Sequence, residues 1–238
     1  MSDATSAETS ARKCPVIAID GPAASGKGTL SRRLAAELGL AHLDTGSLYR
    51  AVALLLLRAG SDPGDGVAAA SEAMTLTPGK VADLSKDPAL RNDATAAAAS
   101  RVSAISAVRE ALLDFQREFA EQPPALADGT PAKGAVLDGR DIGTVICPDA
   151  EAKLFVTAST EVRAQRRLNE LQGRGVPAIY ENVLEEMKDR DARDSQREVS
   201  PLVPAADAFL LDTSALDADQ ALHAALTFIR TRPAFKDL

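Results

Sequence analysis

Short, mainly apolar runs alternate with amphipathic segments along the chain. The runs lie at 16–19, 41–43, 135–137, 153–156 and 208–211. Runs of this length are typical of strands that are buried on both faces. Between them lie segments with helical spacing; at 29–38, Leu30, Leu34 and Leu38 fall on one stripe. The pattern predicts an α/β fold, in which a parallel sheet carries helices on both faces.

Three stretches depart from this alternation. Residues 60–93 are rich in Gly, Pro, Asp, Ser and Thr, so we expect loops and short elements in an insertion outside the sheet. Residues 122–134 contain two adjacent prolines and are expected to form a surface loop. Residues 1–13 are polar and lack an apolar run, so we expect a disordered tail and not a signal peptide.

Composition and charge limit the kinds of molecule that this protein is expected to bind. A formal net charge of −7 argues against a nucleic-acid-binding surface, which needs an excess of basic side chains. The longest apolar stretch, 51–57, is far shorter than the roughly 20 residues of a membrane helix. Two cysteines and two histidines favour neither a disulfide framework nor a zinc site. We therefore expect a cytoplasmic monomer that binds small molecules.

Residues 21–29 carry the strongest motif. They fit G-x-x-x-x-G-K, the phosphate-binding loop (P-loop), and lie between a predicted strand and a predicted helix. Backbone N–H groups and the positive end of the helix cradle phosphate oxygens in such a loop, and Lys27 would reach the outer phosphates. We expect a nucleoside triphosphate to be bound by Gly21, Pro22, Ala23, Ala24, Ser25, Gly26, Lys27, Gly28 and Thr29.

The residues at the end of this loop indicate how Mg²⁺ would be bound. Gly28 follows Lys27 at the position where many P-loops have the hydroxyl that binds Mg²⁺, and Thr29 comes one residue later. The Gly-Lys-Gly-Thr ending resembles that of nucleoside monophosphate kinases, in which the metal is held largely by waters and substrate phosphates. We therefore expect no direct protein ligand for Mg²⁺, with Thr29 as a contact through water.

Arginines at three places predict a second anion site, because planar guanidinium groups bind phosphate in bidentate fashion. Arg50 lies in the opening turn of an apolar helix that follows the strand at 41–43. Arg140 and Asp141 follow the strand at 135–137, and ligands of parallel sheets bind at such strand ends.

The third place is a helix with Ile179, Val183 and Met187 on its inward face. At helical spacing the same face continues with Arg190, Arg193, Asp194 and Arg197. Charged side chains directed at the core are costly unless an anion meets them. The alternative is that the helix leaves the core there and exposes a solvated charged face.

A further group of arginines, Arg163, Arg166 and Arg167, lies close after the strand at 153–156. This segment could fold over the triphosphate as a lid, since a polyanion would offset the crowding of like charges. A surface helix would also tolerate the three arginines.

The motifs GPAASGKGT, LDTGSLYR, LDGRDIGTV and RDARDSQR occur in this order across nearly the whole chain, which thereby resembles the bacterial cytidylate kinases. The resemblance implies a P-loop kinase core with a five-stranded parallel sheet at 14–59 and 94–238, and a short lid around 163–180. A nucleotide-monophosphate-binding insertion would occupy 60–93 and extend to about 110. Such enzymes transfer the γ-phosphate of ATP, with Mg²⁺, to CMP or dCMP.

The resemblance also implies roles for individual residues. Arg50, Arg140 and Arg190 would hold the acceptor phosphate, Asp194 would bind the pentose hydroxyls and Arg197 would complete the pocket, which also includes Thr45. Ser100, Arg109 and Asp141 would contact the cytosine edge. The lid arginines Arg163, Arg166 and Arg167 would bind ATP, and Lys27, Arg140, Arg190 and Arg167 would be the catalytic residues.

Some positions depart from the family pattern. Ala24 stands where the loop often has glycine, and Thr45 where serine is commoner. Ser100 and Arg109 are nine positions apart, on opposite sides of one straight helix, so a break is required between them. The family tends to break this segment with proline, which is absent here; Ser106 instead has the sequence context of a helix N-cap.

Two other functions stay open on the sequence. One is a kinase for another small acceptor, such as UMP, AMP, gluconate or shikimate, although the arginines favour a phosphorylated acceptor. The other is a nucleotide-operated switch or binding module, for which we find no base-reading motif. The sequence does not rank CMP, dCMP and UMP, because they differ by single groups.

Overall fold

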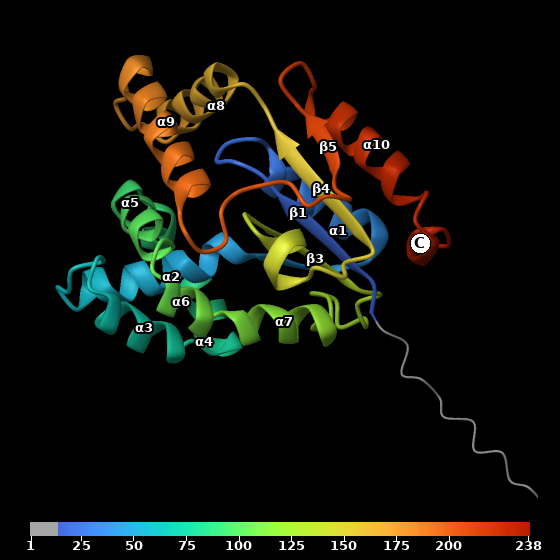
Figure 1. Ribbon diagram of the computed structural model, residues 1–238, viewed down its shortest axis with the longest axis horizontal. Coiled ribbons are helices and arrows are strands. Elements are labelled where there is room, and N and C mark those ends of the chain that lie inside the picture. The colour runs from blue at the N-terminus through green and yellow to red at the C-terminus, as the bar shows by residue number, and fades with distance from the viewer. Residues whose placement is uncertain (1–13) are drawn as a thin grey trace, which may run out of the picture.

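A computed structural model describes residues 14–238; the tail expected at 1–13 lies outside the described residues. Five parallel strands form one sheet in the order β2-β3-β1-β4-β5 (Figure 1). The predicted α/β fold with a five-stranded parallel sheet is confirmed. The strands are β1 (Val16–Asp20), β2 (Ala41–Asp44), β3 (Ala135–Gly139), β4 (Ala152–Thr157) and β5 (Phe209–Asp212).

Two buried strands at the middle of the sheet position the glycine loop and the segment that contains Arg140. Every residue of β1 and of β3 is buried, as the apolar runs predict. Their register pairs Val16 with Ala135 and Asp20 with Gly139, so both strands end at the same level. The glycine loop after β1 and the segment after β3 therefore lie next to each other at the carboxyl edge of the sheet.

Helices cover both faces of the sheet. On one face, α1 (Lys27–Leu38) packs its predicted stripe of leucines against β1, β3 and β4, with α10 (Ala218–Ile229) beside it. On the other face, α2 (Thr45–Arg58) and α7 (Leu113–Glu121) contribute to the larger apolar core. The 122–134 segment between α7 and β3 contains no helix or strand, as expected of a loop.

Residues 60–93 are more helical than the sequence suggested. They form α3 (Gly66–Met74), α4 (Pro78–Ser85) and the 3₁₀-helix η1 (Pro88–Arg91), which all pack against α2 and take no part in the sheet. The polar residues that indicated loops are helix N-caps. The side chains of Asp65, Thr77 and Asp87 accept backbone N–H groups of α3, α4 and η1 respectively.

The helical segment that contains Ser100 and Arg109 is interrupted between these two residues, as the resemblance requires. Helix α5 (Asp93–Val102) ends before a turn at 103–105, and α6 (Ser106–Ala111) begins directly after it, without a proline. Ser106 is nevertheless the first helical residue and not the N-cap. The N-cap position is Ile105, which has no side chain to fulfil that role, so this detail of our prediction was wrong.

Two helices stand together above the carboxyl edge of the sheet (Figure 1). Helices α8 (Thr160–Gly173) and α9 (Tyr180–Gln196) pack on each other through a small apolar cluster of their own. Val183 and Met187 are buried as predicted, but Ile179 is 62% exposed because it is the N-cap residue and precedes the helical face. None of the helices in residues 14–238 has the length and apolar character of a membrane span.

Gly21, the first residue of the glycine loop, offers a test of how closely this loop packs on β4. Its φ is +152°, and an added Cβ would lie 2.0 Å from the carbonyl oxygen of Val156. We expect Gly21→Ala to lower the free energy of unfolding by about 2–4 kcal/mol in denaturant titrations.

Gly79 is the matched control, since a Cβ there meets nothing within 4 Å and its backbone is helical. Gly79→Ala should leave stability unchanged or raise it slightly. Equal stability of the two variants would show that the loop does not pack as described.

Candidate active site

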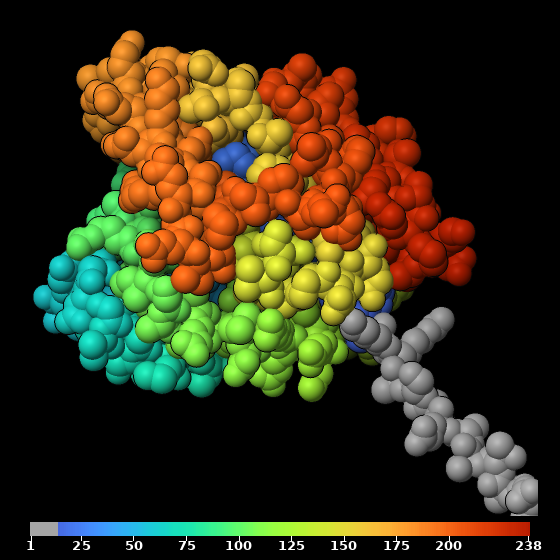
Figure 2. Space-filling model, viewed as in Figure 1, coloured from blue at the N-terminus to red at the C-terminus, as the bar shows by residue number. Residues whose placement is uncertain are grey.

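A cavity opens at the carboxyl edge of the sheet, where β1, β2 and β3 end. Figure 2 shows blue, N-terminal residues in a hollow beside the orange segment that contains α9. Most of the predicted site residues line this cavity. They are Ala23, Ala24, Lys27, Thr45, Arg50, Arg109, Arg140, Asp141, Arg167, Arg190, Asp194 and Arg197.

The glycine loop forms one wall. Ala24 has a positive φ of 57°, a conformation that glycine adopts more easily, which explains why a glycine is common at this position in similar loops. Lys27 begins α1, and its ammonium donates a hydrogen bond to the carbonyl oxygen of Pro22 at 3.1 Å. Gly21, Pro22, Ser25, Gly26 and Gly28 complete the loop and the first turn of α1.

Lys27 lies in a strongly perturbed environment. Burial above all, and the nearby Arg140 and Arg190, lower the pKa of Lys27 to about 7, while Asp138 and Asp44 act in the opposite direction. The charged form is therefore poorly stabilised in the free protein. An anion placed against Lys27 would restore it.

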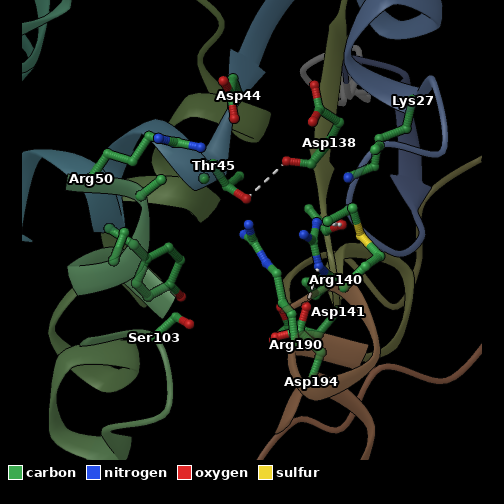
Figure 3. A pocket seen from close by; sticks show the side chains of 18 of the residues that line it. Lys27, Asp44, Thr45, Arg50, Ser103, Asp138, Arg140, Asp141, Arg190 and Asp194 are labelled. Carbon is green, nitrogen blue, oxygen red and sulfur yellow. Dashed lines mark hydrogen bonds and ion pairs between the residues drawn. The ribbon is translucent and has the colours of Figure 1, made fainter. Parts of the chain in front are cut away.

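A wall of guanidinium groups runs from beside Lys27 to the far side of the cavity, where Arg50 lies (Figure 3). Arg140 follows β3, and its Nε donates to Oδ2 of Asp194 on α9 at 2.8 Å, which fixes the direction of the guanidinium. Burial lowers the pKa of Arg190 to about 10, and the charge of Arg140 adds to the effect. Burial also lowers the pKa of Arg50, on α2. These three cations face one cavity.

Two guanidinium nitrogens of this wall lack a partner. Nε of Arg190 and Nη2 of Arg197 are buried and form no hydrogen bond with any of the described residues. Buried donors without acceptors cost free energy. Asp194 offsets only part of the charge: burial raises its pKa, but Arg140, Arg190 and Arg197 lower it more, so the carboxylate is charged. The wall is thus built to receive an anion.

One end of the cavity is a buried ion pair. Arg109 on α6 donates to Asp141 at 2.5 Å, and its guanidinium lies 5.5 Å from the centre of the Tyr49 ring. The Ser103 hydroxyl belongs to the same end (Figure 3). Ser103 also accepts a hydrogen bond from Arg109 through its carbonyl oxygen. Such fixed donors and acceptors suit the edge of a polar ring.

The structure places Ser100 differently from the expectation. The Ser100 hydroxyl accepts a hydrogen bond from Arg193 of α9 at 3.0 Å, and Ser103, nearly one helical turn later, lines the cavity in its place. Sequence reasoning missed Ser103, which lies in none of the motifs, and Tyr49, which lies in the motif LDTGSLYR next to Arg50. It also gave no role to Asp44 and Asp138, although both belong to motifs at strand ends and line the cavity.

Asp20, at the end of β1, was missed as well. Its two carboxylate oxygens accept the N–H groups of Ile142 and Gly143, each at 2.8 Å. These bonds start the single π-helical turn η2 (Ile142–Ile146) directly after Asp141. Burial raises the pKa of Asp20 to about 6. The sequence signal that could have identified Asp20 is its position between a buried strand and the glycine loop.

The three lid arginines have different environments. Arg163 is buried and donates to both oxygens of Asp191 and to the carbonyl oxygen of Ala23, so it ties α9 to the back of the glycine loop and does not face the cavity. Arg167 lines the cavity, where it pairs with Asp93 of α5 at 2.7 Å and with Glu170 at 2.9 Å.

Arg166 borders a second hollow on the other side of the glycine loop. It donates to the hydroxyl and carbonyl oxygens of Thr213 at 3.0 and 2.7 Å. The hollow also includes Gly26, Thr29, Leu30, Val156, Leu216, Asp217, Ala218 and Ala221. Its mixed apolar and polar lining could hold a flat ring, with the glycine loop between that ring and the main cavity.

The described residues hold no cluster of three or more His, Cys, Asp or Glu side chains that is arranged for a metal ion. Thr29, expected near Mg²⁺ through water, borders the second hollow. The carboxylates of Asp44 and Asp138 are instead the ones that meet the main cavity next to Lys27. This arrangement fits a cation that arrives with a ligand's phosphates better than one bound by protein alone.

A glycine loop on a parallel sheet, facing an arginine wall, defines a P-loop kinase. Residues 17–231 match the family model described as "Cytidylate kinase", so the chain belongs to the cytidylate kinase family. It is 59% identical over 217 residues to "Cytidylate kinase" of Paramagnetospirillum magneticum (strain ATCC 700264 / AMB-1), covering 91% of this chain and 98% of that protein.

A second relative, "Cytidylate kinase" of Xanthobacter autotrophicus (strain ATCC BAA-1158 / Py2), is 58% identical over 219 residues, 92% of this chain and 99% of the relative. Among solved structures, an uncharacterized protein from Eubacterium ventriosum ATCC 27560 matches with a TM-score of 0.52 at 15% identity, covering 92% of this chain and 99% of that one. That likeness shows the fold alone.

The lowered pKa of Lys27 predicts proton uptake when a triphosphate binds. At pH 8 the free side chain is mostly neutral, because its pKa is about 7, and contact with phosphate favours the charged form. We expect ATP binding to take up about one proton at pH 8 and almost none at pH 6, where Lys27 is already charged.

Calorimetry in two buffers of different ionisation enthalpy measures this uptake. Lys27→Arg is the control, since arginine stays protonated and should abolish the difference between buffers. Identical binding enthalpies in both buffers at pH 8 for the unmodified protein would contradict the assignment.

Proposed function

We propose that this protein transfers the γ-phosphate of ATP to CMP or dCMP and releases ADP with CDP or dCDP. The observation that carries the proposal is the meeting of two anion sites in one cavity. Lys27 and the glycine loop form the first site, and Arg50, Arg140 and Arg190 form the second. Membership of the cytidylate kinase family supports cytidine nucleotides as acceptors.

The donor would lie along the glycine loop. The backbone N–H groups of residues 21–29 and the ammonium of Lys27 would hold its phosphates, and ATP would enter as its magnesium complex. The adenine would occupy the second hollow, next to Arg166. We propose that phosphates and waters hold the metal, with Asp138 and Asp44 as the nearest carboxylates and Thr29 as a more distant contact through water.

The acceptor would lie against the arginine wall. Arg50, Arg140 and Arg190 would bind its phosphate, which supplies the anion that the partnerless donor of Arg190 requires. Asp194 would accept hydrogen bonds from the pentose hydroxyls while it orients Arg140. Arg197 would complete the pocket and Thr45 would border it.

The nucleobase would sit at the Arg109–Asp141 end. The pair presents a donor and an acceptor fixed to each other, which suits the amino and carbonyl groups of cytosine. Ser103 faces this end directly, and Ser100 would reach it only after its hydrogen bond with Arg193 opens. A uracil ring would present a carbonyl in place of the amino group and leave Asp141 without a donor.

The transfer itself needs no protein nucleophile. An oxygen of the acceptor phosphate attacks the γ-phosphorus, and the bond from that phosphorus to the bridging β–γ oxygen breaks, so ADP leaves with the electron pair. Lys27, Arg140, Arg190 and, after release from Asp93, Arg167 would neutralise the charge on the moving group. Arg163 would act indirectly, because it holds the glycine loop from behind.

The proposed division into parts follows from this scheme. We propose that residues 60–93, extending to about 110, bind the acceptor, and that residues around 163–180 form a lid over the donor. Both would close only when both nucleotides are bound, so that water is excluded. We further propose that the protein is a cytoplasmic monomer. Analytical ultracentrifugation would then give a mass of 24.8 kDa in solution.

An acceptor panel tests the assignment. With ATP and Mg²⁺, we expect kcat/KM for CMP and dCMP to exceed that for UMP by at least about 100-fold, because Asp141 would lose its donor with uracil. We expect AMP to be a poor acceptor as well, because its purine is larger than the single ring of cytosine. Release of ADP measures the rate. Equal rates with UMP or AMP, or activity with shikimate, would assign the protein to another acceptor.

Lys27→Ala tests the donor site. Loss of one charge contact in the transition state should lower kcat on the order of 10²- to 10³-fold. Lys236→Ala, at an exposed position near the C-terminus and outside the cavity, is the control and should keep normal turnover. Near-normal turnover of the Lys27→Ala variant would reject the proposed role.

A further inference from the structure

His42 lies behind the active-site cavity and contacts one of the carboxylates that line it, Asp138. It lies on β2, the edge strand, and its Nε2 is 2.7 Å from Oδ2 of Asp138 on β3. The register pairs His42 with Val136 and Asp44 with Asp138, so the imidazole and the carboxylate are two positions apart on the same face of the sheet. Both side chains are largely buried, with exposed fractions of 16% and 5%.

Asp138 is an acidic residue in a cavity whose other walls are mainly cationic. It lines the cavity, and its charge acts on Lys27, where it raises the pKa against the effect of burial. Figure 3 shows Asp138 and Lys27 at the same end of the cavity, away from Ser103 and Asp194. The field of the carboxylate therefore reaches the ammonium that is proposed to bind phosphate.

The two groups nevertheless form no ion pair. Within the described residues, no ion pair joins Lys27 to an Asp or Glu side chain within 4 Å, and the ammonium donates to the backbone of Pro22 instead. The Asp138 main chain is also held, because its carbonyl oxygen accepts the Thr45 hydroxyl at 2.8 Å. One Asp138 carboxylate oxygen is engaged by His42.

We propose that His42 is a positioning residue: its imidazole holds the Asp138 carboxylate back from Lys27 and thereby keeps the ammonium available to the phosphates of ATP. Without the imidazole, the carboxylate would be free to turn toward Lys27 and would compete with the triphosphate for its ammonium. The inference rests on the proposed binding of ATP at the glycine loop and is independent of the acceptor's identity.

The contact through Nε2 suggests a matched pair of variants. The amide of glutamine reaches about as far as Nε2 of histidine, whereas the amide of asparagine reaches only as far as Nδ1. His42→Gln should keep the contact with Asp138 and bind ATP normally. His42→Asn should lose it and weaken ATP binding about tenfold, the size of one competing, partly buried ion pair.

The Asp138→Asn background separates this mechanism from a general structural effect. A neutral amide does not compete for Lys27, so His42→Asn should have no effect on ATP affinity there. His223→Asn, at the other histidine of the chain, on α10, is the control and should bind ATP normally. Affinity is measured by calorimetry with ATP alone, on protein whose folded state is verified by circular dichroism.

A second readout does not depend on ATP. With two histidines in the chain, the ring N–H proton of His42 can be assigned in a proton NMR spectrum from the signal that His42→Asn removes. We expect this proton to exchange slowly in the unmodified protein and to exchange rapidly in Asp138→Ala, which removes the acceptor.

Three results would overturn the proposal. They are unchanged ATP affinity in His42→Asn, an equal loss of affinity in the presence and absence of the Asp138 carboxylate, and a His42 ring proton whose exchange is the same in Asp138→Ala as in the unmodified protein. A protein that binds ATP as expected but phosphorylates another acceptor would refute the proposed function and leave this inference intact.

Discussion

Repulsion among partly buried cations is the constraint on which the active-site cavity depends. Lys27, Arg50, Arg140 and Arg190 converge on one cavity, and burial lowers the pKa of Lys27 and of Arg190. Concentrating like charges away from water is unfavourable unless carboxylates or ligands offset them. Asp194 and Asp138 offset part of the charge in the free protein. The remainder is available to two phosphorylated nucleotides.

The rest of the fold holds these charges in place. The shared level at which β1 and β3 end brings the glycine loop next to Arg140. Asp20 anchors the turn that follows Asp141, and Arg163 ties α9 to the glycine loop. The polar atoms of Asp20 and Arg163 are all hydrogen-bonded, so these two residues hold the segments around the cavity rigidly. The donors of the arginine wall that lack partners lie where ligands are expected. In the same way, His42 is proposed to hold the carboxylate of Asp138 in place.

Much of this could be predicted from the sequence, because the strands and the loop motifs are local patterns. The apolar runs located all five strands, and the spacing of glycines and Lys27 located the loop. Arg190 and Asp194 were found because charges occupy positions where the core was expected, and Arg140 because it follows a buried strand. Burial and strand order bring them together, as the structure shows.

What could not be predicted depends on contacts between distant segments. Asp65, Thr77 and Asp87 have the composition of loops and act as helix caps, which a composition argument does not distinguish. The inward direction of Arg163 follows from Asp191, which is 28 positions away. Whether Ser100 or Ser103 meets the cavity depends on the approach of Arg193. No spacing rule along one helix encodes these outcomes.

The central claim is that donor and acceptor sites face each other across one cavity. A compound in which adenosine and cytidine are joined through five phosphates would occupy both at once, and calorimetry gives its affinity directly. We expect it to bind at least about 100-fold more tightly than ATP or CMP alone, since the second site is engaged intramolecularly. The gain should be lost in Lys27→Ala and in Arg140→Ala alike. An affinity no greater than that of ATP would contradict the account.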